Sequence, residues 1–218
     1  LTLSAREEGA TPIETTFESA DSLLHGLWNE LLVEGKRDAD NTQIDVTINS
    51  SYLMSLNITI PEFNGSCNLR FGNSEEGDQP FSAVIQDIRL WNPQTEATDG
   101  YDDVARYTGV VTGKETGLTA WLPLNELEGN PVEQSRGKAV TNTGQWTIPT
   151  IESKALALNG DSTVMITLND WTPIYDATLS CWFNKTATGA MTLLSLNDPE
   201  SADGVNSEHW EVGFDADG

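Results

Sequence analysis

The sequence predicts an all-β protein in which two antiparallel sheets pack face to face as a sandwich or jelly roll. Short runs of alternating apolar and polar residues dominate the chain, and a period of two is typical of half-buried strands. Gly, Asn and Asp punctuate these runs at intervals of roughly 8 to 12 residues, as in sandwiches and jelly rolls. Helical signals are weak, and 218 residues suit one large all-β domain.

The alternating runs place the expected strands along the chain. Residues 43–48 are the clearest example, because three polar and three apolar residues follow one another in turn. The other strands are expected at residues 53–60, 82–91, 119–124, 155–158, 164–168, 178–183, 191–196 and 209–214. Short helical turns are expected only at residues 92–97 and 102–107, and an acidic loop at residues 197–208.

The two ends of the chain predict a hairpin with each other. Residues 1–5 and 210–214 alternate like strands, and Asp217 and Gly218 would form the turn if tail were joined to head. New termini are tolerated best at such hairpin tips. The sequence is therefore expected to be either circularly permuted or a window from an array of repeated modules. The absence of an initiator Met at Leu1 favours the window.

The charge excludes several classes of partner. The net charge is −23, from 34 Asp and Glu against 11 Lys and Arg, so phosphate backbones and anionic membranes would be repelled. No apolar run approaches the roughly 20 residues of a membrane-spanning helix. We expect no nucleic-acid partner and no membrane insertion. The acidic surface is favoured to be solvated and soluble, and clustered carboxylates that bind Ca²⁺ are the alternative.

The cysteines are expected to face a core. Cys67 and Cys181 both lie in apparent strands, with apolar residues at alternate positions around them. Two buried free thiols are favoured, while a disulfide outside the cell would require close Cα atoms. No Cys or His spacing indicates a zinc site.

Five segments together resemble LamG-like, concanavalin A-like jelly-roll modules. Residues 85–92 (Ile-Gln-Asp-Ile-Arg-Leu-Trp-Asn) are similar to a strand near the end of such modules, and residues 117–126 (Gly-Leu-Thr-Ala-Trp-Leu-Pro-Leu-Asn-Glu) to the stretch that opens them. Residues 155–161, 178–183 and 27–33 resemble three further strands of the family, although Asn29 stands where a His is usual.

The order of these segments is permuted relative to the family. Residues 1–116 resemble the C-terminal half of a LamG-like module and residues 117–218 resemble the N-terminal half. Together the two halves correspond to one complete jelly roll, in agreement with the hairpin predicted from the ends. The resemblance implies an extracellular or cell-surface location and neighbouring modules of the same protein as partners.

No pair of catalytic residues is evident in the sequence. Jelly rolls that hydrolyse β-glucans place alternate carboxylates on one face of a strand, whereas Glu208, Glu211 and Asp215 have other spacings. His25 and His209 have no partnered Ser or Cys in the sequence. We therefore interpret the chain as non-enzymatic.

The resemblance implies one candidate metal site. In related jelly rolls the positions that match Asp87 and Glu126 help to bind a structural Ca²⁺ ion. The alternative is that Asp87 hydrogen-bonds to backbone between neighbouring strands. Asp198, Glu200 and Asp203 in the acidic loop are a second candidate set.

Glycan binding would require an exposed aromatic side chain. Of the seven tryptophans, those at family positions that are normally packed are expected in the core: Trp28, Trp91 and Trp121. The less constrained ones are Trp146, Trp171, Trp182 and Trp210. Trp182 alternates with Cys181 and Phe183 and should face away from the core, so it is the candidate carbohydrate-binding residue.

These observations support two hypotheses about function. The first is a non-enzymatic module of a repetitive extracellular surface protein, an adhesin or a surface filament, with a structural and ligand-presenting role. The second is a carbohydrate-binding module of a secreted multidomain enzyme. Closely spaced exposed aromatics lining a groove would favour the second hypothesis.

Overall fold

The protein is described here as a computed structural model. The structure describes residues 2–6, 13–16, 27–38, 41–49, 51–58, 67–73, 80–91, 111–115, 117–150, 153–168, 178–187, 189–197 and 209–214. The predicted helical turns at 92–97 and 102–107 lie outside these ranges, as do residues 198–208 of the predicted acidic loop.

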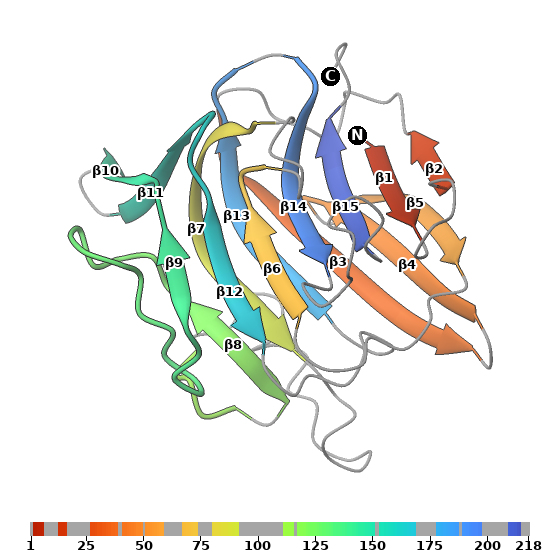
Figure 1. Ribbon diagram of the computed structural model, residues 1–218, viewed down its shortest axis with the longest axis horizontal. Coiled ribbons are helices and arrows are strands. Elements are labelled where there is room, and N and C mark those ends of the chain that lie inside the picture. Colours follow the sequence, from red (N-terminus) through yellow and green to blue (C-terminus); the bar gives the residue numbers. More distant parts are fainter. Residues whose placement is uncertain are drawn as a thin grey trace, which may run out of the picture.

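Two antiparallel sheets make up the described part of the chain and lie as face-to-face layers (Figure 1). The seven-stranded sheet has the order β2-β1-β15-β14-β6-β12-β9. Its strands are β1 (Thr2–Arg6), β2 (Ile13–Thr16), β6 (Cys67–Phe71), β9 (Val140–Asn142), β12 (Val164–Leu168), β14 (Met191–Asn197) and β15 (His209–Phe214). The predicted all-β sandwich of two antiparallel sheets is thereby confirmed.

The eight-stranded sheet has the order β10-β11-β7-β13-β3-β4-β5, and β8 pairs with β7 beside this path. Its strands are β3 (Asn29–Asp38), β4 (Asn41–Ile48), β5 (Ser51–Ile58), β7 (Ser82–Trp91), β8 (Leu118–Leu122), β10 (Gln145–Thr150), β11 (Ser153–Asn159) and β13 (Thr178–Lys185). The first half of β7 pairs with β11 and its second half with β8, while β13 covers its other edge.

The strand predictions hold with a few corrections. The expected bounds of β7, β12 and β15 are those of the structure. The strand predicted at residues 119–124 is wrong at its C-terminal end, where it is too long, because β8 stops at Leu122. Pro123 has no N–H to continue the ladder, and Leu124 has a φ of 56°. The prediction missed three short strands, which are β2, β9 and β10.

The strands from the two ends of the chain pair with each other. β1 runs antiparallel to β15, with Leu3 opposite Val212 and Ala5 opposite Trp210. This pairing was predicted from the alternation of residues 1–5 and 210–214 and is confirmed. In Figure 1 the two strands lie side by side, although they carry the opposite extremes of the colour scale.

Strands from residues 1–116 and 117–218 are interleaved in both sheets. β6 lies between β14 and β12 in the seven-stranded sheet. β7 lies between β11 and β13 in the other sheet, and β13 in turn pairs with β3. Each half of the sequence therefore supplies hydrogen-bonding neighbours to some strands of the other half.

The main core fills the space between the sheets. Strict alternation along β3 and β12 sends one side of each strand into it. An aromatic group joins the layers, because Phe183 of β13 and Phe214 of β15 meet with ring centroids 6.0 Å apart. Phe81 contacts both rings, at 6.2 Å from Phe183 and 5.8 Å from Phe214. Aromatic pairs of this kind add to the stabilisation from burial.

No helix occurs within the described ranges, and none there could cross a membrane.

Candidate functional site

Asp87 lies at a bulge in strand β7. The register between β7 and β13 shifts between the pairs Ser180–Arg89 and Trp182–Gln86, so β7 carries one extra residue there. Asp87 occupies the bulge with a φ of 53°, and its N–H donates to the carbonyl of Pro123 at 3.3 Å. Asp tolerates this left-handed conformation better than most residues. The bulge turns the Asp87 side chain towards β8.

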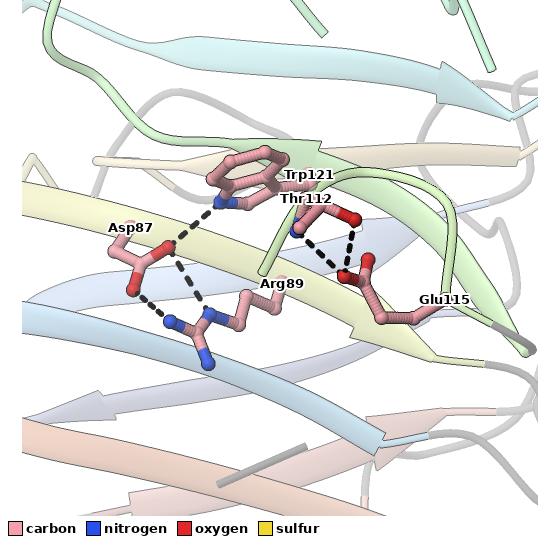
Figure 2. Close-up of polar contacts among 5 residues, drawn as sticks. All are labelled: Asp87, Arg89, Thr112, Glu115 and Trp121. Atoms are coloured by element: carbon pink, nitrogen blue, oxygen red, sulfur yellow. Dashed lines mark hydrogen bonds and ion pairs between the residues drawn. The ribbon is translucent and has the colours of Figure 1, made fainter. Parts of the chain in front are cut away.

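The Asp87 carboxylate is held by two side chains (Figure 2). Its Oδ1 accepts hydrogen bonds from Trp121 Nε1 at 2.9 Å and from Arg89 Nε at 3.1 Å. Its Oδ2 pairs with Arg89 Nη2 at 2.6 Å. The side chains of Arg89 and Asp87 are only 11% and 22% exposed, so this bidentate pair is well shielded from solvent. Asp87 therefore links β7 to β8 through side chains.

Glu126, the other predicted calcium ligand, lies on the loop after β8. Its Oε1 accepts from the backbone N–H of Val132 at 3.0 Å. Its Oε2 is buried and has no hydrogen-bond partner among the residues that the structure describes. Among the described residues, no three His, Cys, Asp or Glu side chains gather into a group that could hold a metal ion. Calcium binding stays a prediction, and at Asp87 it would compete with Arg89.

Several predicted site residues lie outside the residues that the structure describes. These include Asp198, Glu200 and Asp203 of the second metal candidate, and also His25 and Trp171. The side chains of Cys67, His209 and Trp210 are likewise outside it, although their backbones belong to strands.

A second small apolar cluster lies beside the Asp87 site. Trp91 is buried there with Val111 and Leu118, and Trp121 packs against them. The Glu115 carboxylate holds the segment that carries Val111 (Figure 2), accepting from Thr112 N at 2.6 Å and Thr112 Oγ1 at 2.7 Å. Slight burial opposes ionisation of Glu115, but these hydrogen bonds outweigh it and lower its pKa.

Glu133 is a buried carboxylate that the sequence analysis did not single out. Its Oε1 accepts from the backbone N–H groups of Trp121 at 2.9 Å and Ser135 at 2.7 Å, and from the Ser135 hydroxyl at 2.5 Å. Its Oε2 accepts from the N–H groups of Arg136 at 2.8 Å and Lys138 at 3.0 Å. Burial would raise its pKa, but the hydrogen bonds outweigh burial and lower the pKa below its ordinary value.

The outer face of the eight-stranded sheet carries a second group of polar side chains around Trp182. Trp182 of β13 lies directly opposite Glu30 of β3 on one side and Gln86 of β7 on the other. Residues opposite each other on antiparallel strands share a face, with Cβ atoms about 4.5 to 5.5 Å apart. We call Glu30, Trp182 and Gln86 the outer-face row.

The outer-face row is open to solvent. The Trp182 side chain is 38% exposed, which confirms the exposure predicted from alternation, and Glu30 and Gln86 are half-buried. Within the described ranges no group hydrogen-bonds to the Trp182 indole, the Glu30 carboxylate or the Gln86 amide. Burial raises the pKa of Glu30, and the nearby Arg89 guanidinium opposes this rise.

The loop between β4 and β5 fixes the start of β3 and thereby the position of Glu30. Asn49 has a φ of 51° and follows the last residue of β4, which suits a tight hairpin turn. Its side chain accepts from the Glu30 N–H at 3.0 Å and donates to Asn29 Oδ1 at 2.9 Å. The Asn29 side chain, fully buried, donates in turn to the carbonyl of Leu27 at 3.0 Å.

Cys181 lies behind the outer-face row and faces the core. It is a free, buried thiol, as the alternation predicted. Burial raises its pKa well above the ordinary range, and the carboxylates of Asp87 and Glu30 raise it further. The thiol therefore stays protonated and is a poor nucleophile.

The other tryptophans with described side chains are less exposed than Trp182. Trp91 is buried as predicted, whereas Trp28 and Trp121 are half-buried. Trp146 of β10 is also half-buried, and its Nε1 donates to the carbonyl of Gly129 at 2.9 Å.

No model of a known protein family matches the chain, and no curated protein matches it either.

Proposed function

We propose that this chain is a non-enzymatic module of a repetitive extracellular surface protein, and that it presents a glycan-binding face around Trp182. The observation that carries the proposal is the outer-face row. An exposed indole lies between a carboxylate and an amide on neighbouring strands, and no described residue forms a hydrogen bond with these three polar side-chain groups. Aromatic faces stack on apolar faces of sugars, and flanking polar groups bond to hydroxyls.

The sheet gives this face the rigidity that binding needs. The row spans three adjacent strands, β3, β13 and β7, whose inner sides are packed in the main core. Sites built on such strands lose little conformational freedom when a ligand binds. The Asp87–Arg89 pair and the Asn49–Asn29 bond fix the two flanks of the row.

We further propose that the sandwich is a LamG-like jelly roll whose halves are in permuted order. The antiparallel pairing of β1 with β15 supports this arrangement. The interleaving of strands from residues 1–116 and 117–218 in both sheets supports it as well. Neighbouring modules of the same protein would then be the natural partners of the chain at a cell surface.

The alternative is a carbohydrate-binding module of a secreted multidomain enzyme. The exposed Trp182 favours it equally, because such a module needs the same aromatic platform. The neighbouring sequence separates the two: further copies of this module would support the surface protein, and a hydrolase domain would support the enzyme.

The glycan-binding proposal is tested by binding. Immobilised neutral, cationic and acidic oligosaccharides are probed with the wild-type chain and with Trp182→Ala, Gln86→Ala and Val132→Ala. Val132 is a matched control, since it is 55% exposed on the loop after β8. We expect binding that Trp182→Ala abolishes, Gln86→Ala weakens and Val132→Ala leaves unchanged. The absence of any binding, or equal binding by folded Trp182→Ala, would contradict the proposal.

A further inference from the structure

We propose that the outer-face row selects cationic amino sugars, meaning oligomers whose sugars carry a free amino group, over neutral and acidic glycans. This inference rests on the proposed glycan-binding function and names its ligand class. It is carried by the position of Glu30 directly across from the exposed Trp182.

Glu30 places a negative charge beside the stacking platform. It lies opposite Trp182 on the same face of the sheet, and its carboxylate receives no hydrogen bond from the part of the chain that the structure describes. An ammonium group on a sugar stacked over the indole would lie within reach of that carboxylate. Partial burial of Glu30 strengthens such an ion pair, because water screens it less.

The indole itself favours a cation. Trp has the strongest cation–π attraction among the aromatic side chains. A free amino sugar therefore gains twice at this row, from the face of Trp182 and from the carboxylate of Glu30. A neutral N-acetylated sugar can stack on Trp182 and bond to Gln86, but it gains neither charge interaction.

The carboxylates around the outer-face row act in the same direction. Glu34 follows Glu30 on the same face of β3 and lies opposite Asp45 of β4. Arg89 also lies on this face, opposite Ser180, and its charge acts on Glu30, but its guanidinium is paired with Asp87. The chain as a whole carries a net charge of −23, which attracts cationic ligands and repels anionic ones at a distance.

Three oligomers of equal length test the selectivity by calorimetric titration: glucosamine, N-acetylglucosamine and galacturonic acid. The pH is one at which most amino groups of the glucosamine oligomer are protonated. We expect the wild-type chain to bind the glucosamine oligomer about 10-fold more tightly than the N-acetylated one. The galacturonic acid oligomer should bind most weakly. Added salt should reduce the preference for glucosamine.

Two substitutions separate charge from stacking. Glu30→Gln should bring the affinities for glucosamine and N-acetylglucosamine oligomers to within about 2-fold of each other, since one charge interaction is lost. Glu128→Gln is the matched control, because Glu128 is an exposed carboxylate on the loop after β8, and it should keep the wild-type preference. Trp182→Ala should abolish binding of both oligomers.

The outcomes distinguish the inference from the function on which it rests. Equal or tighter binding of the neutral oligomer, lost in Trp182→Ala, would overturn the selectivity and leave glycan binding intact. A preference for glucosamine that survives Glu30→Gln would also overturn it. Binding of none of the three oligomers would overturn it together with the proposed function.

Discussion

The Glu133 carboxylate accepts the backbone N–H of Trp121 at 2.9 Å, although the two residues are 12 positions apart. The next loop residue, Gln134, donates its N–H to the carbonyl of Trp121 at 2.9 Å. Both backbone groups of Trp121 on the free edge of β8 are thus used by the loop. An edge covered in this way is protected from pairing with another chain. The same contact fixes Trp121, which holds Asp87.

Replacing Glu133 by Gln should destabilise the protein by about 2 kcal/mol, because several hydrogen bonds to a buried charge are lost or weakened. Chemical denaturation measures the change. Glu128→Gln, on an exposed carboxylate of the same loop, is the control and should change stability by less than about 0.5 kcal/mol. Equal stability of the two variants would contradict the role assigned to Glu133.

The Glu133 contribution should depend on pH. Its folded pKa is lowered from the ordinary value of 4.5, so its stabilisation is fully present above 4.5 and is lost as the pH falls through the folded pKa. The difference in unfolding free energy between wild type and Glu133→Gln should therefore shrink in acid. A difference that is independent of pH would argue against an ionised Glu133.

Replacing Glu30 by Gln should stabilise the protein at neutral pH. The folded pKa of Glu30 is raised from 4.5, mainly by burial, so its unfavourable effect grows as the pH rises from 4.5 through the folded pKa. Below 4.5 the wild type and the variant should be equally stable. Denaturation at several pH values checks this, and a loss of stability in Glu30→Gln at neutral pH would show that attraction to Arg89 outweighs burial.

Residues 1–116 and 117–218 should each fail to fold alone, since each sheet contains strands from both halves and strands such as β6 and β7 lie between strands of the other half. Exposed edges and an uncovered apolar face should make each fragment aggregate. Mixed under refolding conditions, the fragments should regain the spectrum of the full chain. Circular dichroism and amide NMR spectra are the measurements, and a full chain cleaved after residue 116 once folded is the control. A cooperative unfolding transition in either isolated fragment would contradict this prediction.

The predicted calcium site is tested with a chelator. If Asp87 and Glu126 bind Ca²⁺, the melting temperature should fall in EDTA, because a ligand of the folded state alone raises stability. Asp87→Ala should remove that difference. The same melting temperature with and without EDTA would show that Asp87 binds no Ca²⁺ under these conditions. The role of Asp87 would then be its contacts with Arg89 and Trp121, and Asp87→Ala should destabilise the protein by about 1 to 3 kcal/mol.

We expect no glycoside hydrolysis by this chain. In the sequence, no predicted strand carries two carboxylates at alternate positions, a spacing that would bring an acid and a nucleophile close together. Incubation with β-glucans and reporter glycosides is the measurement, with a denatured sample as the control. Turnover that disappears on replacement of one carboxylate would contradict the expectation.

The sequence was most informative where local pattern decides the structure. Alternation fixed the bounds of β12 and the outward position of Trp182, because a period of two forces neighbours to opposite faces. The short strand β9 has only three residues, too few for a periodic signal. Strand β10 contains Pro149 and lies at a sheet edge, where a Pro is tolerated but weakens the pattern.

The polar sites depend on contacts that local pattern does not carry. Asp87 was singled out by resemblance, but its bulge arises from the register of β7 against β13. Nothing in the local sequence marks Glu133 as important, apart from the Ser135 that follows it closely. Its role depends on how the loop returns to the backbone of Trp121. The outer-face row likewise exists only once Glu30, Trp182 and Gln86 have been brought into register.

The pairing of β1 with β15 sets how the module would respond to tension. Thr2 lies opposite Gly213 at one end of the strand pair, and Arg6 lies opposite His209 at the other end. A force that separates Thr2 from Gly213 therefore loads the hydrogen bonds of the ladder one after another, so that β1 peels away from its neighbour. The same bonds loaded in shear would have to break together. If the chain is a module of a stretched surface filament, as proposed above, the β1–β15 pair would open at a lower force than a pair loaded in shear.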